Sequence, residues 1–386
     1  MSRARLLFVV ESGTDVRLVD GLAEHFELSI IARKIEGGRE INWPPSANVP
    51  VTLGPSGRAA FARFVFRELL RHKSQIDVVL VQGYSLAALA TNVSRQFTSK
   101  PVLLLVCSPV EAYYRCRRAF PDGRPYHKHE AALLDFLARA NAMASPEYVV
   151  LSRHLEELVR SHGARRVHNV PLYGVDTHLF TPPLQPKSEI KKRLQLPTDG
   201  VLIFFSSRIA PEKDSETLLR AVRRLVDSGQ HLWLLHRSGG YQSFVRDAER
   251  FGVAGRVIAT DAVHPQRQLP LDYQTCDLCV QASREEGLGF SPLEALACGV
   301  PVIATAVGGL KETVIDGRTG WTYPVGDDQR FAAAIAEAVA NPVEAQRRAA
   351  LGRQLVCERF DRQRVFRDFA DLIDRITGMA GSKAHS

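Results

Sequence analysis

Residues 284–301 read REEGLGFSPLEALACGVP, and the residue types and spacing in this stretch fit the binding of a polar ligand. Glu286 and Glu294 stand eight positions apart, with Gly287 and Gly289 between them. Glycines let backbone N–H groups approach a ligand closely, and carboxylates accept hydrogen bonds from hydroxyl groups. The stretch therefore predicts a loop that binds a ligand rich in hydroxyl or phosphate groups.

A helix is expected directly after this loop. Ser291 is a favourable N-cap, Pro292 suits the first helical position, and Gly299 followed by Pro301 ends the helix. A helix N-terminus favours an anion such as a diphosphate, and Glu294 in the first turn can accept two hydrogen bonds from a ribose diol. In the alternative, a capping box, Glu294 only accepts the backbone N–H of Ser291. The spacing leaves both interpretations open.

A second loop, SSRIAPEKD, follows an expected strand at residues 201–205 and carries Arg208 and Lys213. Ligands of open α/β sheets bind beyond the carboxyl ends of the strands. Arginine offers a bidentate fork and lysine a point charge, so together they can neutralise a diphosphate. The alternative is a solvated basic loop in which Glu212 is a surface ion-pair partner.

The elements that must position these loops follow from the rest of the chain, whose 386 residues are enough for two domains. Short apolar runs alternate with amphipathic helical patterns, which is typical of parallel sheets covered on both faces. The expected strands lie at residues 6–10, 28–32, 78–81, 102–106, 201–205, 232–236, 257–259, 278–281 and 302–304. We therefore expect an α/β protein with two doubly wound Rossmann-like domains facing across a cleft.

Prolines 171, 182, 183 and 186 break the pattern within residues 168–190, which indicates a junction between domains. We expect an N-terminal domain over residues 1–176 and a C-terminal domain over residues 177–361. The last amphipathic segment, residues 362–378, is a candidate to pack back onto the first domain.

Basic residues outnumber acidic ones by 50 to 42, and residues 1–180 carry 23 basic against 17 acidic side chains. An anionic partner surface is therefore expected mainly on the N-terminal domain. Two segments concentrate the charge: Arg58, Arg63, Arg67, Arg71 and Lys73 in one, and Arg115, Arg117, Arg118 and Arg124 in the other. The first segment is an amphipathic helix that either lies on an anionic membrane or has one buried and one solvated face. Nucleic acid is not an expected partner, because no binding module accompanies the charge.

Cys276 and Cys279 form a CxxC pair with no second Cys/His pair nearby, so no metal site is expected. The apolar run at residues 6–10 is too short for a secretory signal, and no stretch approaches the roughly 20 apolar residues of a membrane span. We expect a cytoplasmic protein, at most peripheral on the inner face of the membrane.

The C-terminal half resembles the GT-B glycosyltransferases of the large retaining family 4, the glycosyl transferases group 1. The resemblance rests on Arg208, Glu212 and Lys213, and on the run from Glu286 to Val302, which matches E-G-x-G-x-x-x-x-E-A-x-A-x-G-x-P-V. Further matches are Val307 to Glu312, Asp316 to Gly320, Leu269 to Asp277, and Gly174 to Phe180. The resemblance covers roughly residues 145–330.

The resemblance implies transfer of a hexose-type sugar, with retention, from a UDP- or GDP-sugar to a hydroxyl of a glycan, lipid-linked or small-molecule acceptor. It implies no metal and no other cofactor. Arg208 and Lys213 would hold the donor diphosphate, Glu286 would contact the transferred sugar, and Glu294 would bind the ribose. The backbone that would cradle sugar and phosphate is that of Gly287, Leu288, Gly289 and Phe290. Gly13, on the loop after the first strand, is a further candidate for phosphate contact.

Three departures from the family pattern concern the site. Ser207 replaces a glycine, residues 236–240 replace a G-x-G loop, and Cys107 and Ser108 replace an acceptor-side histidine. Glu111, Tyr113, His127 and His129 lie nearby in sequence, and nothing selects among them. An epimerase of the same fold and a catalytically silent nucleotide-sugar binding or scaffolding protein remain alternatives.

Overall fold

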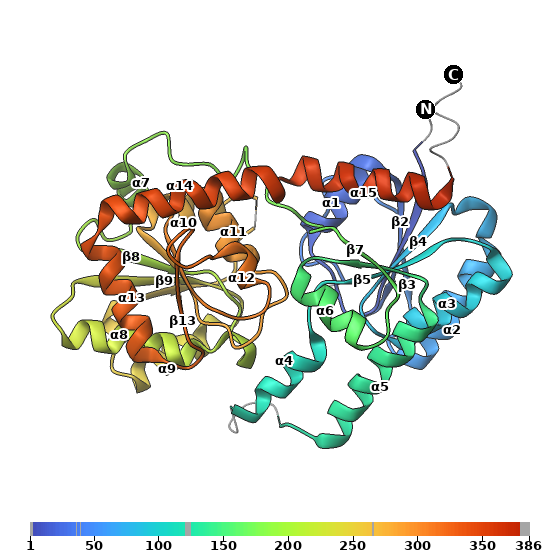
Figure 1. Cartoon of the computed structure of the whole chain (residues 1–386), viewed down its shortest axis with the longest axis horizontal. Coiled ribbons are helices and arrows are strands. Elements are labelled where there is room, and N and C mark those ends of the chain that lie inside the picture. The colour runs from blue at the N-terminus through green and yellow to red at the C-terminus, as the bar shows by residue number, and fades with distance from the viewer. Residues whose placement is uncertain (1–2, 36, 39, 120–124, 265, 379–386) are drawn as a thin grey trace. The chain divides into compact units, whose positions relative to one another are not determined.

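The computed structural model describes residues 3–35, 37–38, 40–119, 125–264 and 266–378 (Figure 1). The described chain forms two compact units. The first contains residues up to Glu111, His127–Gly174 and the chain from Arg362 onward, and the second contains Ala112–Tyr126 and Val175–Asp361. Ala112–Tyr126 thus interrupts the first unit and groups with the second. The domain limits expected from the sequence stay a prediction.

The first unit is built on a parallel sheet of seven described strands in the order β3-β2-β1-β4-β5-β6-β7. The strands are β1 (Arg5–Val10), β2 (Glu27–Arg33), β3 (Val51–Gly54), β4 (Val78–Gln82), β5 (Val102–Val106), β6 (Glu147–Val150) and β7 (Arg166–Asn169). The helices are α1 (Val16–His25), α2 (Arg58–Arg71), α3 (Leu86–Thr98), α5 (Lys128–Ala144), α6 (Arg153–Ser161) and α15 (Arg362–Thr377). A further helix, α4 (Val110–Cys116), begins in this unit and continues into the second.

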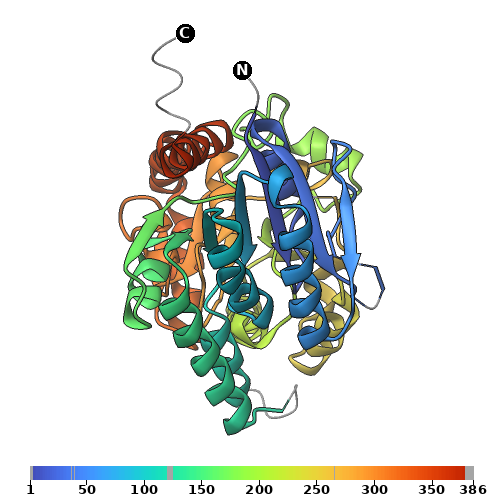
Figure 2. The same cartoon turned by 90° about the vertical axis from the view of Figure 1, so that its right-hand side faces the viewer.

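Helices α2, α3 and α5 lie side by side along one face of this sheet (Figure 2). Helix α15 packs on α1 within the same unit, where a Cβ added to Gly21 would lie 2.1 Å from the ring of Phe366. Phe366 is fully buried there. A glycine on α1 therefore lets the last helix approach closely.

The second unit is built on a parallel sheet of six described strands in the order β10-β9-β8-β11-β12-β13. The strands are β8 (Val201–Phe205), β9 (Leu232–Arg237), β10 (Val257–Thr260), β11 (Leu278–Gln281), β12 (Val302–Thr305) and β13 (Trp321–Tyr323). The helices are α7 (Lys187–Arg193), α8 (Ser215–Asp227), α9 (Tyr241–Arg250), α10 (Leu269–Thr275), α11 (Phe290–Ala297), α12 (Leu310–Thr313), α13 (Asp328–Ala340) and α14 (Pro342–Arg359).

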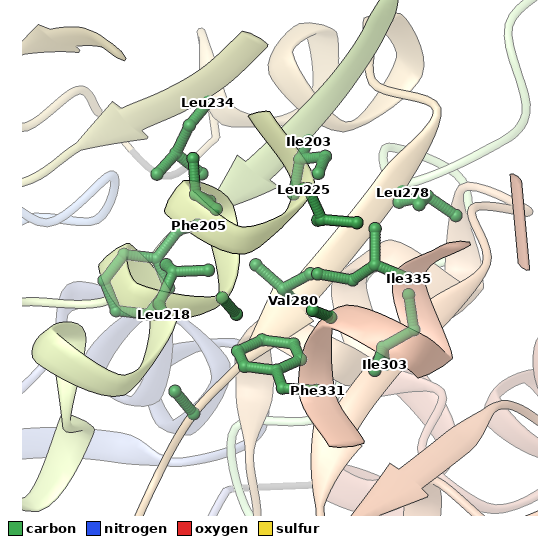
Figure 3. Packing of buried hydrophobic residues seen from close by; sticks show 14 of the residues in the cluster. Ile203, Phe205, Leu218, Leu225, Leu234, Leu278, Val280, Ile303, Phe331 and Ile335 are labelled. Atoms are coloured by element: carbon green, nitrogen blue, oxygen red, sulfur yellow. The ribbon is translucent and has the colours of Figure 1, made fainter. Parts of the chain in front are cut away.

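The core of the second unit fills the space between its sheet and helices α8 and α13. Figure 3 shows Ile203, Val280 and Ile303 of neighbouring strands packed against these helices, and all three are fully buried. Burial of such side chains is the main favourable contribution to folding. The core therefore holds β8 and β11 rigidly, and these are the strands from which the two candidate loops start.

All nine predicted strands are found, and the prediction of an α/β protein with two doubly wound Rossmann-like domains is confirmed. Four strands escaped prediction: β3, β6, β7 and β13. Each has only three or four residues, and three of them are edge strands. An edge strand needs less burial, so its sequence lacks the apolar run that identifies a central strand.

Candidate functional site

The two candidate loops leave the second sheet at its topological switch point. Strands β9 and β10 extend the sheet on one side of β8, whereas β11, β12 and β13 extend it on the other. β8 and β11 are therefore the strands at the switch point, and sheets of this type bind ligands beyond the carboxyl ends of such strands. Arg208 and Lys213 lie on the loop after β8, and Glu286 lies on the loop after β11. The fold thus brings together residues about 75 positions apart.

Glu286 is the centre of the hydrogen-bond network between these loops. Its Oε2 atom pairs with the ammonium of Lys213 and accepts hydrogen bonds from Ser283 Oγ at 3.1 Å and Gln281 Nε2 at 3.5 Å. The side chains of Lys213 and Glu286 are only 12% and 10% exposed. Gln281 Oε1 accepts a hydrogen bond from Ser207 Oγ at 3.0 Å. A buried ion pair and its hydrogen bonds therefore tie the two strand ends together.

Ser207 is compatible with its position on the loop after β8. It is not among the described non-glycine residues with positive φ, so the change from glycine carries no backbone strain. The Ser207 side chain is buried and supplies the hydrogen bond to Gln281. The replacement therefore adds a link within the site.

Arg208 lies further out than Lys213. Its guanidinium pairs with Glu212, and the side chains are 65% and 6% exposed respectively. Glu212 is therefore a buried partner rather than the surface residue that the sequence alternative assumed. The backbone N–H of Arg284 donates to Glu212 O at 2.8 Å, which joins this loop to the one after β11. The Arg208 guanidinium is therefore exposed to solvent, while its loop is held in place by the bond between Arg284 and Glu212.

The glycine loop enters α11 two residues earlier than the sequence predicted. Gly289, with φ 92° and ψ 77°, is the N-cap, and the helix starts at Phe290. The prediction of Ser291 as N-cap is wrong, because the left-handed backbone that glycine permits turns the chain into the helix before Ser291. Ser291 Oγ instead donates to Ser206 O at 2.7 Å, another link between the loops. The predicted end at Gly299 is confirmed by its φ of 70° and by the bond from its N–H to Leu296 O at 2.9 Å.

Glu294 lies inside α11 and is 3% exposed. Tyr273 donates its hydroxyl to Glu294 Oε2 at 3.0 Å, and burial raises the pKa of Tyr273 well above its usual value, so the phenol stays protonated. The capping-box alternative fails, because it needs a serine at the N-cap and Gly289 is there instead. Leu288 is 2% exposed, so its side chain is not available to a ligand.

Two further glycines, Gly308 and Gly309, fix the position of the loop after β11. Gly309 N donates to Glu286 O at 3.0 Å. A Cβ added to Gly308 would lie 2.0 Å from Glu286 O, and one added to Gly309 would lie 2.3 Å from Gly287 O. Backbone therefore packs directly on backbone, and both glycines are needed for this contact.

Tyr113 is the site residue whose place sequence reasoning missed. It was one of four acceptor-side candidates, yet it belongs to the second unit, where its hydroxyl lies 3.4 Å from Glu286 Oε1. The two residues are 173 positions apart, and no local pattern connects them.

The remaining acceptor-side candidates lie in the first unit. Glu111 Oε1 is 3.5 Å from His162 Nε2, and the rings of His127 and His129 stack with centroids 5.4 Å apart. Burial raises the pKa of Cys107 to about 12, so its thiol stays protonated. Nothing in these contacts selects an acceptor-side catalyst.

Gly13 also lies in the first unit, in the loop after β1, with φ 85°. It is therefore not in the same compact unit as the other predicted donor residues. Within the described residues, no group of three or more His, Cys, Asp or Glu side chains is arranged to hold a metal ion. Separately, none of the described helices combines the length and apolar character of a membrane span.

His236, at the end of β9, points into the core instead of the crevice. It is fully buried, its Nδ1 lies 2.9 Å from Phe205 O, and its ring stacks on Phe205 with centroids 5.3 Å apart. Burial lowers the pKa of His236 from 6.5 to about 4, although the hydrogen bond to Phe205 opposes the shift. The His236 side chain therefore packs in the core against Phe205.

This burial predicts an acid-dependent loss of stability. The unfolded chain binds a proton at His236 below about pH 6.5, whereas the folded protein does so only near pH 4. Stability is therefore present above pH 6.5 and falls as the pH approaches 4. We expect wild type to lose about 2 kcal/mol more unfolding free energy than His236→Asn between pH 7.5 and 5. Chemical denaturation at both pH values measures this, and equal losses would contradict it.

Solved structures identify the class of fold. Sucrose-phosphate synthase from Thermosynechococcus elongatus superposes with a TM-score of 0.81 at 20% identity, over 98% of this chain and 100% of that one. Anabaena Alr3699/HepE in complex with UDP superposes with a TM-score of 0.75 at 16% identity, over 96% and 100%. The chain therefore has the two-domain GT-B fold.

The family follows from the sequence comparison. The family described as Glycosyl transferases group 1 matches residues 186–354, and this match confirms the predicted resemblance.

Two curated relatives each align with less than half of the chain. The D-inositol 3-phosphate glycosyltransferase of Xylanimonas cellulosilytica is 37% identical over 178 residues, which is 43% of this chain and 41% of the relative. The GDP-mannose-dependent alpha-(1-6)-phosphatidylinositol monomannoside mannosyltransferase of Mycolicibacterium smegmatis is 34% identical over 188 residues, or 46% and 48%. The aligned region spans less than half the length of each relative.

Proposed function

We propose that this protein is a retaining glycosyltransferase that moves a hexose-type sugar from a UDP- or GDP-sugar to an acceptor hydroxyl. The observation that carries the proposal is the buried Lys213–Glu286 pair, which joins two loops at the switch point of the second sheet. Both named relatives act on inositol-containing compounds. An inositol-containing small molecule or lipid is therefore the acceptor class to test first.

In the proposed reaction, the bond between the anomeric carbon and the diphosphate oxygen breaks as the acceptor oxygen bonds that carbon on the same face. The acceptor proton passes to an oxygen of the departing diphosphate. Arg208 and Lys213 neutralise that diphosphate, assisted by the backbone N–H groups at the start of α11. Glu286 orients the transferred sugar, and Glu294 holds the ribose. Cationic side chains supply the charge stabilisation, so the reaction needs neither a metal nor another cofactor.

The N-terminal unit is the proposed acceptor side, and its basic surface is the proposed contact with an anionic membrane. On α2, Phe61, Val65 and Leu69 are buried, whereas Arg63 and Arg67 are exposed. The apolar face of α2 is thus used for packing, and the proposed peripheral contact at the cytoplasmic face is electrostatic. Arg124 of the second basic segment lies outside the described residues. Vesicle sedimentation tests this, because purely electrostatic binding disappears at high salt.

The direct test of the function is donor binding by Glu294→Ala. We expect wild type to be stabilised against heat by a UDP- or GDP-sugar, because a ligand that binds only the folded state stabilises it. Glu294→Ala should lose this shift, since the ribose loses its carboxylate partner. Glu358→Ala, on the exposed face of α14, is a control that should keep it. Equal shifts in both variants would refute the assignment of Glu294.

Product analysis then separates the proposed activity from its alternatives. A glycosyltransferase releases nucleoside diphosphate in step with glycosylated acceptor. An epimerase of this fold changes the nucleotide sugar without any acceptor. A silent binding or scaffolding protein binds donor but turns over nothing across a broad panel of donors and acceptors.

A further inference from the structure

Tyr113 comes from a part of the chain that the donor-binding resemblance does not cover. It lies on α4, in the segment Ala112–Tyr126 that the structure groups with the second unit. Its hydroxyl is 3.4 Å from Glu286 Oε1, and it accepts the backbone N–H of Gly287 at 3.3 Å. The Lys213 ammonium lies 6.0 Å from the centre of the Tyr113 ring. The Tyr113 side chain thus contacts two residues of the proposed donor site, Glu286 and Gly287, and lies near a third, Lys213.

The two oxygens of the Glu286 carboxylate have different partners. Lys213, Ser283 and Gln281 all contact Oε2. Tyr113 is the partner of Oε1. Oε2 is therefore committed to holding the loops together, and Oε1 is the oxygen through which Glu286 can bind a sugar hydroxyl.

The phenol of Tyr113 forms the same kinds of hydrogen bond that a sugar hydroxyl can form. Burial, and next the charge of Glu286, raise the pKa of Tyr113 well above its usual value, so its proton stays on the oxygen. The protonated hydroxyl donates to Glu286 and accepts from Gly287. A sugar hydroxyl has the same two capacities. Both contacts, at 3.3 and 3.4 Å, are long for hydrogen bonds and are easily exchanged.

We propose that the Tyr113 hydroxyl and one hydroxyl of the transferred sugar compete for Glu286 Oε1 and the Gly287 N–H, which makes Tyr113 a specificity-determining residue of the sugar subsite. The inference rests on the proposed function. A nucleotide sugar must displace the Tyr113 hydroxyl from both groups. The loss of these two hydrogen bonds offsets part of the free energy gained when the sugar binds. A nucleoside diphosphate lacks the sugar and meets no such competitor. A sugar without a suitably placed hydroxyl cannot replace the lost contacts and is disfavoured.

Tyr113→Phe tests the competition by a gain of affinity, which a merely structural role would not produce. Calorimetric titrations would use UDP, GDP, UDP-glucose and GDP-mannose. We expect the nucleotide sugar that wild type binds to bind Tyr113→Phe about fivefold more tightly, since one net hydrogen-bond exchange is removed. Affinity for the matching nucleoside diphosphate should not change. Tyr126→Phe removes another hydroxyl of the same segment, one that accepts from Arg118, and should change neither affinity.

The outcomes separate this inference from the proposed function. The competition is refuted if Tyr113→Phe binds the nucleotide sugar no more tightly than wild type does. It is also refuted if the affinities for the nucleotide sugar and for the nucleoside diphosphate change by the same factor. In both cases the proposed donor site stands. If wild type binds neither UDP- nor GDP-sugars, the function and the inference both fail. Thermal melting without ligand shows whether each variant is folded, and Tyr113→Trp, which also lacks the hydroxyl, is the second variant should the phenylalanine protein fail to fold.

Discussion

Replacing Lys213 with alanine is expected to lower kcat/KM for sugar transfer by about a thousandfold, the scale of losing one buried charge-stabilising group. Lys213 has two tasks in the proposed reaction. Its ammonium pairs with Glu286, and both side chains are nearly buried. In the proposed reaction it also neutralises the departing diphosphate. Alanine removes the cation from the leaving group and leaves the Glu286 carboxylate without its charged neighbour. Steady-state assays with the preferred donor and acceptor measure the effect.

Two variants sharpen this prediction. Lys213→Arg keeps the positive charge but not the compact ammonium geometry, so it should restore only part of the activity. Lys192→Ala removes an exposed lysine from α7 and should leave activity unchanged. Activity of Lys213→Ala comparable to that of Lys192→Ala would show that the buried pair has no part in catalysis.

Gly309→Ala is expected to have a large effect although it alters no charged or polar side chain. The added Cβ would lie 2.3 Å from Gly287 O and 2.6 Å from Leu288 Cα. These are backbone atoms, so no flexible side chain can yield. Gly309 has φ −68°, which suits alanine, and the conflict is therefore steric only. We expect a loss of about 3 kcal/mol in unfolding free energy, the upper end for overpacking, and at least tenfold weaker donor binding.

Chemical denaturation followed by tryptophan fluorescence, together with donor titration, measures both effects. Gly255→Ala is the matched control, because its added Cβ meets nothing within 4 Å. That variant should stay within about 0.5 kcal/mol of wild type. A Gly309→Ala protein as stable and as tight-binding as this control would mean that the loop is not held by the backbone contact.

Prediction from sequence succeeded where local chemistry decides structure. The central strands, such as β5 and β8, are continuous apolar runs, and burial on both faces leaves few other possibilities. The end of α11 was equally predictable, because a glycine in the left-handed region terminates a helix by a local hydrogen-bond pattern. The predicted start of the same helix was wrong. Ser291 and Gly289 both favour a cap, and the left-handed backbone of Gly289 turns the chain into the helix before Ser291.

The same division holds for the site. Arg208, Lys213 and Glu286 could be named from their loops, since ligand-binding loops follow strands in this fold. Their pairing could not be named, because it depends on which strands become neighbours. Tyr113 is the clearest case, because the residues that it contacts, Glu286 and Gly287, lie more than 170 positions away in the sequence.

By itself, the sequence determined the fold class, the family of residues 186–354 and the loops that carry the site, because apolar runs, glycines and capping residues act over a few positions. Only the tertiary structure decided which charge faces which carboxylate, that His236 is buried, and that α4 supplies a hydroxyl to Glu286. The physical reason is that these contacts join segments distant along the chain, and their free energy becomes available only once the sheet has ordered its strands.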